Sequence, residues 1–346
     1  MCPVVHPTPG FSGNHGVHPP HRKGAEGIPS REGANYDSTS VVVLPGHNEL
    51  RTSEPETPEE ADPLRPVKRL NGEVTRQRRN PYAGGERTQV WIGLWTKGGG
   101  EKVCLKTLRT TESSNELRRK RLEAELPRWA ELRHPHVLPL YGMVTDIGAH
   151  LFMVTPWRED GNLLLYVKNN PRLDKNSLLR GSACGLSYLH SRGIVHGSVK
   201  CNNVLVSQEG EPQICDFGIA GIMTAEKDDS GSVSSKEPSG EVARYAAPEL
   251  IIHKGSTATT HSDTYSFAML ILECITEAVP FPDIIDDAGV IHARISKRQT
   301  PPRPSGQESG NHISDNLWHL MHRCWSIEPH KRPTMEHVHH FFLEIS

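Results

Sequence analysis

The residues of this chain that could do chemistry are concentrated in the stretch "IVHGSVKCNNVLV", residues 194–206. It contributes an imidazole, a hydroxyl, an ammonium group and an amide, from His196, Ser198, Lys200 and Asn203, and its pattern is typical of a loop that leads into a strand. The hydroxyl of Ser198 cannot serve as a general base near pH 7, because it has too little proton affinity. It can at most accept a hydrogen bond from another hydroxyl group.

Two further reactive groups lie in strand-like surroundings. Asp216 stands in "CDFG", after the apolar run "PQI", and Lys106 stands in "VCLK". Together with Lys200 and Asn203 they form a set of one carboxylate, one amide and two ammonium groups. Such a set has no evident structural purpose unless it holds a charged ligand, although an inherited fold could also retain it passively.

Glu125 is a candidate partner for Lys106. Leu122, Glu125, Trp129 and Leu132 have helical spacing, so Glu125 falls on an apolar stripe. A carboxylate on a buried face needs a cation, and removing one partner of a truly buried pair costs about 3 to 5 kcal/mol. We therefore expect an ion pair between Lys106 and Glu125. The alternative is that Glu125 lies at the edge of the stripe.

The order of these motifs resembles that of the protein kinases, most nearly the tyrosine-kinase-like branch, from about residue 68 to the C-terminus. "VCLK" resembles V-A-I-K, residues 196–203 resemble H-R-D-L-K-x-x-N, and "CDFG" contains D-F-G. "AAPE" contains the kinase A-P-E, ending at Glu249, whose usual partner corresponds to Arg332. Asp263 resembles the aspartate that caps the backbone of the catalytic loop. The resemblance implies a two-lobed α+β protein kinase fold.

The same resemblance implies ATP and Mg²⁺ as cofactors. Lys106, paired with Glu125, would hold the α- and β-phosphates, Lys200 would approach the γ-phosphate, and Asn203 and Asp216 would bind the metal. The remaining cofactor-binding residues that it implies are two of the glycine-rich loop, the gatekeeper and a hinge residue that offers its amide: Gly85, Val90, Thr155 and Arg158.

The pattern is broken at two places. In "AGGERTQV", Ala83, Gly85 and Thr88 stand at the three glycine positions of G-x-G-x-x-G-x-V, so only the middle glycine is present. Branched Thr88 should loosen a phosphate cradle, because glycine lets backbone amides approach closely. In the catalytic loop, Gly197 replaces arginine and Ser198 replaces the catalytic aspartate.

The loss of this aspartate leaves two hypotheses about function. A general base contributes about 10² to 10⁴ in rate, which corresponds to about 3 to 5 kcal/mol of barrier. Phosphoryl transfer, however, passes through a loose transition state that depends mainly on metal ions and positioning. The leading hypothesis is an ATP-binding pseudokinase that acts as a scaffold or allosteric partner with weak or no phosphotransfer. The alternative is an active Ser/Thr or dual-specificity kinase with an atypical loop.

The elements that must position these residues change character along the chain. Residues 1–66 are rich in proline, glycine and histidine, and this composition predicts a disordered tail. Residues 68–156 predict a small lobe of strands, with one helix at 113–132 that Pro127 should kink. Residues 157–346 predict a larger helical lobe, with helices around 177–190, 261–276 and 314–325.

Composition narrows the class of protein further. The formal net charge is −2, which gives no general attraction to nucleic acid or anionic membranes, so any partner must be recognised locally. We expect no nucleic-acid partner. The basic runs at 76–79 and 118–121 are interpreted as solvated surface. The seven cysteines contain no C-x-x-C pair, so we expect a reducing, intracellular and cytoplasmic setting without disulfides. No apolar run is long enough to span a membrane.

Overall fold

The structure is a computed structural model that describes residues 67–84, 88–108, 115–148, 150–224, 240–253, 255–304 and 313–345. These residues all belong to one compact unit of the chain. The predicted tail at 1–66 lies outside the described residues, and so does Gly85.

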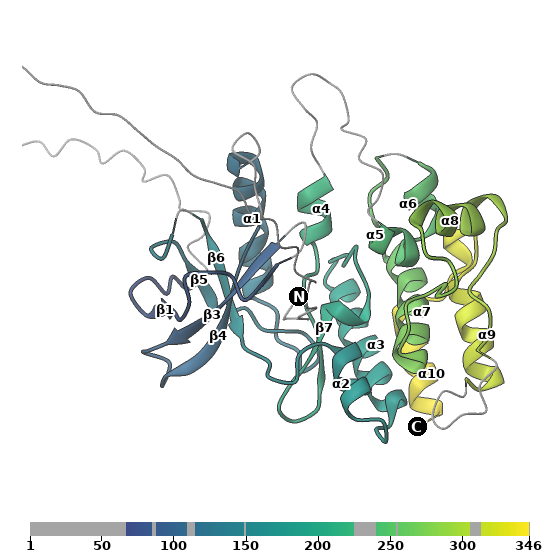
Figure 1. The fold of residues 1–346 in the computed structure, drawn as a ribbon, viewed down its shortest axis with the longest axis horizontal. Helices are drawn as coiled ribbons and strands as arrows, with labels where there is room; N and C mark the ends of the chain where they lie inside the picture. Colours follow the sequence, from purple (N-terminus) through teal and green to yellow (C-terminus); the bar gives the residue numbers. More distant parts are fainter. Residues whose placement is uncertain are drawn as a thin grey trace, which may run out of the picture. The chain divides into compact units, whose positions relative to one another are not determined.

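The small lobe is built on an antiparallel sheet with the strand order β1-β3-β4-β6-β5, in which β2 also pairs with β3 (Figure 1). Its strands are β1 (Val74–Arg76), β2 (Ala83–Gly84), β3 (Thr88–Trp95), β4 (Glu101–Leu108), β5 (Gly142–Val144) and β6 (Phe152–Pro156). The hairpin expected around "KGGG" is the β3–β4 connection, and these two strands pair along their whole length. Lys106 therefore lies on a central strand, opposite Val90 on one side and Met153 on the other.

One helix packs beside this sheet. Helix α1 (Asn115–Ala130) buries Leu122, Leu126 and Trp129, and it continues through Pro127 as a single helix. Proline removes one backbone donor, but the buried face on both sides of it keeps the segment helical. Helix α1 thus ends two residues before the end predicted for it.

The segment after α1 is less strand-like than its apolar pattern predicts. Only the last three residues of 136–144 join the sheet, as β5. The preceding backbone pairs instead with β8, since Leu138 N–H donates to Ile214 O at 2.9 Å and Ile214 N–H donates to His136 O at 2.9 Å. This loop also lies against helix α3, where a Cβ on Gly185 would stand 2.3 Å from His136 O. We call residues 131–137 the α1–β5 loop.

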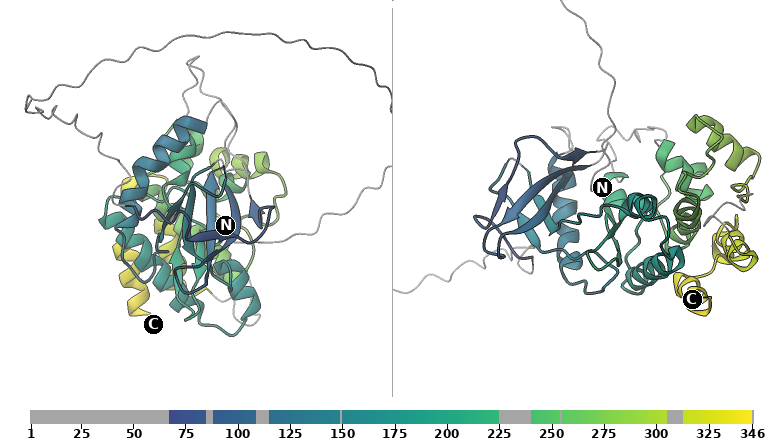
Figure 2. Two further views of the ribbon diagram at one scale, coloured as in Figure 1. Left: turned by 90° about the vertical axis from the view of Figure 1, so that its left-hand side faces the viewer. Right: turned by 60° about the horizontal axis from the view of Figure 1, so that its bottom comes forward.

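The larger lobe is mainly helical, as predicted, and Figure 2 shows it beside the sheet from two further directions. Its helices of five residues or more are α2 (Leu163–Asn169), α3 (Lys175–Ser191), α4 (Ile219–Thr224), α5 (Gly240–Tyr245), α6 (Pro248–Ile252), α7 (Thr260–Thr276), α8 (Asp287–Ile291), η2 (His292–Ser296), α9 (Asp315–Cys324) and α10 (Met335–Glu344). Short η1 (Cys201–Asn203) precedes the hairpin of β7 (Val204–Val206) and β8 (Pro212–Ile214), and η3 (Pro329–Lys331) precedes α10.

Helix α7 is the centre of this lobe. It begins at a capping box formed by Thr259 and Ser262, and all of its residues from Ser262 to Ile275 are buried. The observed architecture confirms the two-lobed α+β fold. Within the described ranges, no helix is both long and apolar enough to cross a membrane.

Candidate functional site

Helix α7 fixes the backbone of the catalytic-loop segment through the side chain of Asp263. Asp263 accepts hydrogen bonds from the backbone N–H groups of His196, at 2.7 Å, and Gly197, at 2.8 Å. This is the capping role expected of Asp263. Gly197 has φ 75°, a left-handed conformation in which glycine carries no Cβ penalty. Glycine at position 197 therefore allows the loop to adopt this backbone conformation without strain.

Ser198 lies beside Asn203. The Asn203 Nδ2 group donates to the backbone oxygen of Ser198 at 2.7 Å and lies 3.3 Å from its hydroxyl oxygen. Because Nδ2 is used in this way, the amide oxygen of Asn203 is the atom that remains for a cation. Asn203 O also accepts from Cys215 N–H at 2.9 Å, so the loop adjoins the segment that carries Asp216.

Lys106 and Asp216 form an ion pair between β4 and the segment after β8. Burial opposes the charge of each group, but their mutual attraction outweighs it. The pKa of Lys106 therefore lies well above its usual value, and the pKa of Asp216 lies well below its usual value. Asp216 also has φ 64°, an uncommon backbone conformation for a residue with a side chain. Both charges are present at neutral pH.

The structure does not show the expected ion pair between Lys106 and Glu125. The Glu125 carboxylate lies 3.6 Å from Arg128, on the same helix, and its side chain is 37% exposed. The buried stripe of α1 consists of Leu122, Leu126 and Trp129, so Glu125 is at its edge, as the alternative interpretation holds. The ammonium group of Lys106 is neutralised by Asp216 instead.

The end of α1 is held against the D-F-G segment by aromatic packing. Trp129 meets Phe217 edge to face, with ring centroids 5.5 Å apart, and Phe217 meets His196 in the same way at 6.5 Å. Helix α4, which follows this segment, also packs against α1. Sequence reasoning placed Trp129 on the apolar stripe of α1 but missed its contact with Phe217. The signal that could have indicated this contact is the large side chain of Trp129 at a helical position predicted to be buried.

An apolar recess adjoins the charged pair. A cavity of about 50 Å³ is bordered by Lys106 and Asp216, by Cys104 and Thr155 on the sheet, and by Leu205 from the larger lobe. Cys104 and Thr155 are paired across β4 and β6. The structure thus brings the gatekeeper candidate Thr155 to the same recess as Lys106.

The other predicted cofactor-binding residues have different surroundings. Val90 is fully buried in an apolar cluster that also contains Cys104, Leu205 and Trp157. The side chain of Arg158 is bonded to Gln213 at 2.8 Å. The group of Arg158 that the resemblance to kinases assigns to a ligand is its backbone amide. Gly85 has no described placement.

Glu273 is a functional-site residue that motif reasoning missed. It lies on α7 behind the catalytic loop, accepts from Cys201 N–H at 2.9 Å and from the Tyr245 hydroxyl at 2.8 Å, and is buried. Burial raises the pKa of its carboxyl group. A single acid inside the apolar run "FAMLILECIT" was the signal for a buried anchor.

The A-P-E motif makes the contact that was expected of it. Arg332 donates to both carboxylate oxygens of Glu249, at 2.6 and 2.8 Å, and the arginine side chain is fully buried. This bidentate pair ties α6 to the segment before α10.

Among the described residues, a hard cation such as Mg²⁺ would find enough oxygen donors only if a bound molecule supplied some of them. Nowhere among them do three histidine, cysteine, aspartate or glutamate side chains converge in a way that could hold a metal ion. The carboxylate of Asp216 and the amide oxygen of Asn203 are oxygen donors of the kind that Mg²⁺ prefers. An ion bound by this pair would complete its coordination with water and phosphate oxygens.

Comparison with known proteins agrees with this geometry. The family model of the protein tyrosine and serine/threonine kinases matches residues 78–342. The chain is also similar to the serine/threonine/tyrosine-protein kinase HT1 of Arabidopsis thaliana, with 27% identity over 267 residues. That match covers 75% of this chain and 63% of HT1, so the chain spans less than two thirds of its relative. With the family match extending over both lobes, the chain belongs to the protein tyrosine and serine/threonine kinase family.

Proposed function

We propose that this chain is a nucleotide-binding pseudokinase, with weak or no phosphotransfer, that acts on a protein partner through its kinase domain. The observation that carries the proposal is the chemistry at residue 198. The group at the position of the catalytic base is a hydroxyl, and its neighbour Asn203 donates to the serine rather than accepting from it. No proton acceptor is therefore supplied by this pair.

Nucleotide binding is supported by the residues around Ser198. Lys106 and Lys200 are cationic, Asp216 is held ionised beside Lys106, and Asn203 has a free amide oxygen by the argument above. A bound Mg²⁺–ATP would supply a phosphoanhydride whose charge these groups match. In this proposal Lys106 exchanges its contact with Asp216 for phosphate oxygens, and Asp216 turns to the metal.

The recess beside Lys106 bears on how a nucleotide would enter. Trp129, Phe217 and Ile219 also line it, so α1 and the segment after Asp216 border the space next to Lys106. In this proposal the two lobes, or α1 and α4, shift when a nucleotide binds. We propose that Glu125, which is now at the edge of α1, approaches Lys106 when that shift occurs.

An active kinase with an unusual loop is the second candidate function. It is favoured by the presence of Lys106, Lys200, Asn203 and Asp216 in one chain, since metal ions and positioning supply most of the catalysis in phosphoryl transfer. In that case Ser198, or a water molecule, would only orient the acceptor hydroxyl.

The test combines two measurements on the full chain. The first is transfer of labelled phosphate from Mg²⁺–ATP to the protein itself and to a general protein acceptor. The second is the thermal shift caused by Mg²⁺–ATP. Both are repeated with Lys106→Ala and Asp216→Asn. We expect a nucleotide-dependent shift that both variants weaken, without transfer by the natural chain.

Two outcomes would contradict the proposal in different ways. Transfer that disappears in both variants would make the chain a working kinase. No shift and no transfer would remove nucleotide binding and leave a scaffold. As a matched gain-of-function control, Ser198→Asp should raise transfer by about 10² to 10⁴ if the rest of the site is competent.

A further inference from the structure

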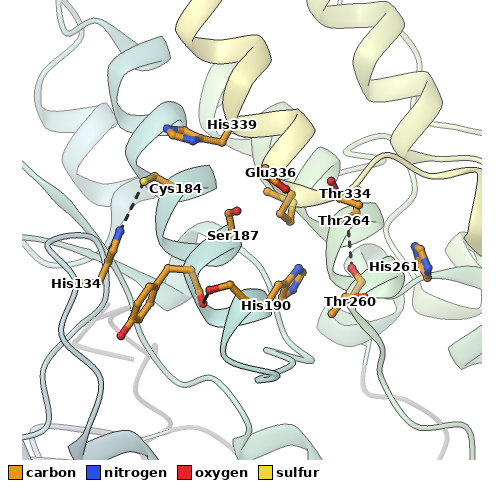
Figure 3. A pocket seen from close by; sticks show the side chains of 13 residues that line it. His134, Cys184, Ser187, His190, Thr260, His261, Thr264, Thr334, Glu336 and His339 are labelled. Carbon is orange, nitrogen blue, oxygen red and sulfur yellow. Dashed lines mark hydrogen bonds between the residues drawn. The ribbon is translucent and has the colours of Figure 1, made fainter.

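A second cavity lies on the larger lobe, and none of the predicted cofactor-binding residues lines it. It has a volume of about 470 Å³ and is bounded by α3, by the first turns of α7 and α10, and by the α1–β5 loop. Four histidines from these four elements line it: His134, His190, His261 and His339. Figure 3 shows His339 reaching from α10 toward the side of α3 that carries Cys184.

The contacts of His134 favour the neutral form of its ring. Its ring stacks on Tyr188 with a centroid distance of 4.6 Å, and its Nε2 lies 3.7 Å from Cys184 Sγ. Its Nδ1 accepts a hydrogen bond from the backbone N–H of His136 at 3.2 Å. A proton on Nδ1 would place two N–H groups against each other and break this bond. Protonation of His134 therefore conflicts with the observed shape of the α1–β5 loop.

The charged surroundings add to this conflict. His134 is repelled by protonated His136 and His339, and His339 in turn by His136, His340 and Arg180. The nearby acids are mostly engaged or exposed. Glu211 lies 3.6 Å from His136 with its side chain 57% exposed, and Asp263 is bonded to His190 at 2.9 Å.

Glu336, on the first turn of α10, and His261, on α7, are the other charged or titratable groups that line the cavity, with Cys184 and Tyr188 on α3. When the rings of His134 and His339 both take up protons, the cavity therefore holds more cations than free carboxylates.

The elements around the cluster are joined to the rest of the domain. Helix α10 packs along α3. The α1–β5 loop connects α1 to the sheet, and His136 O accepts from Ile214 N–H, two residues before Asp216. A change in the loop would therefore reach the strand that leads to Asp216.

We propose that His134 and His339 form a proton-sensitive latch, in which neutral rings let the α1–β5 loop, α3 and α10 pack together and protonation loosens α10 and the loop. Burial, followed by repulsion from neighbouring histidines, lowers the pKa of both His134 and His339 below the ordinary value of 6.5. The unfolded chain then binds protons more readily than the folded one. Stability is complete above pH 6.5 and is lost as the pH falls toward the lower pKa values of the folded chain.

The test is the thermal midpoint of the full chain at pH 7.5 and at pH 5.5, in the natural protein and in the double variant His134→Asn, His339→Gln. Asn keeps an oxygen that can accept from His136 N–H but does not titrate. We expect the variant to lose less on acidification than the natural chain, by on the order of 2–4 °C, which is the shift that about 1 kcal/mol produces in a domain of this size.

The comparison between variants is needed because burial also lowers the pKa of His196 and His322. His330→Gln is the matched control, since His330 is a histidine with a 74% exposed side chain outside the cluster. It should leave the pH dependence unchanged. An equal loss in the natural chain, the control and the double variant would overturn the latch.

Hydrogen exchange in the natural chain keeps the proposal testable if the double variant fails to fold. At pH 5.5, and after correction for intrinsic rates, the amides of α10 and of Leu138 should lose protection relative to those of α7. Unchanged relative protection would also overturn the latch. Neither measurement requires a nucleotide, so the outcome is separate from that of the proposed function.

Discussion

Two regions of the molecule pair their charges differently. We call the surroundings of Arg332 and Asp263 the base of the larger lobe, and the recess bordered by Lys106 and Asp216 the cleft. At the base, Arg332 is paired with both oxygens of Glu249, and Asp263 is bonded to two backbone N–H groups and to His190. In the cleft, Lys106 and Asp216 have each other, while the residue that should take a proton is Ser198. Both regions pair their charges within the protein. Arg332 binds both oxygens of its partner and two backbone oxygens as well, whereas the ammonium group of Lys106 contacts one oxygen of Asp216.

The largest effect should follow from breaking the pair at the base. Arg332→Ala leaves Glu249 without its partner and frees the backbone oxygens of Ser326 and His261. We expect a loss of about 3 to 5 kcal/mol in the free energy of unfolding, because one charge of a buried pair is left unpaired. Urea denaturation measures it. Lys331→Ala, which breaks an exposed pair with Glu328, is the control. A loss as small as that of the control would show that the two regions do not differ.

An intermediate effect is expected in the cleft. Asp216→Asn leaves the ammonium of Lys106 buried without its anion, and Asn is suited to the left-handed backbone at this position. A double-mutant cycle with Lys106→Met should give a coupling of about 0.5 to 3 kcal/mol. Unfolding of the four proteins in urea without nucleotide would measure it. Additive effects would mean that the ion pair contributes nothing to the stability of the unliganded domain.

The smallest effect should come from Glu125→Gln. Its ion pair with Arg128 is exposed on α1, and such pairs contribute about 0 to 1 kcal/mol. We expect no measurable change in the thermal midpoint of the unliganded chain. The neighbouring change Leu126→Ala, at a fully buried position of the same helix, should instead cost about 2 to 5 kcal/mol. A large loss with Glu125→Gln would mean that Glu125 already supports Lys106 in solution.

Several parts of the fold and site could be predicted because they depend on local pattern. The alternation in residues 89–95 and 102–108 indicates the β3–β4 hairpin, and the helical periodicity of 261–276 indicates α7. The partner of Glu249 was also predictable, since motif order identified Arg332. These contacts lie in parts of the chain where the local pattern and the family resemblance agree.

Other parts depend on contacts between segments that are far apart in the sequence. The run 136–144 is apolar enough for a strand, but its first half pairs with β8 rather than with the sheet. Helical spacing predicted that Glu125 shares the buried face with Leu122. In the structure the helix is turned so that the next residue, Leu126, lies in the core instead of Glu125. The partner of Lys106 is set by where α1 and α4 rest on the D-F-G segment, which no local pattern encodes.

The amino-acid sequence alone was enough to identify the lobes, the order of the motifs and the replacement of the catalytic aspartate by Ser198, because these follow from residue identity, spacing and periodicity. Folding in three dimensions was needed to pair Lys106 with Asp216, to leave Glu125 at the edge of α1 and to gather histidines from α3, α10 and the α1–β5 loop around one cavity. Coulomb attraction, burial and proton uptake depend on distance and solvent exposure, and these quantities exist only once the segments have packed.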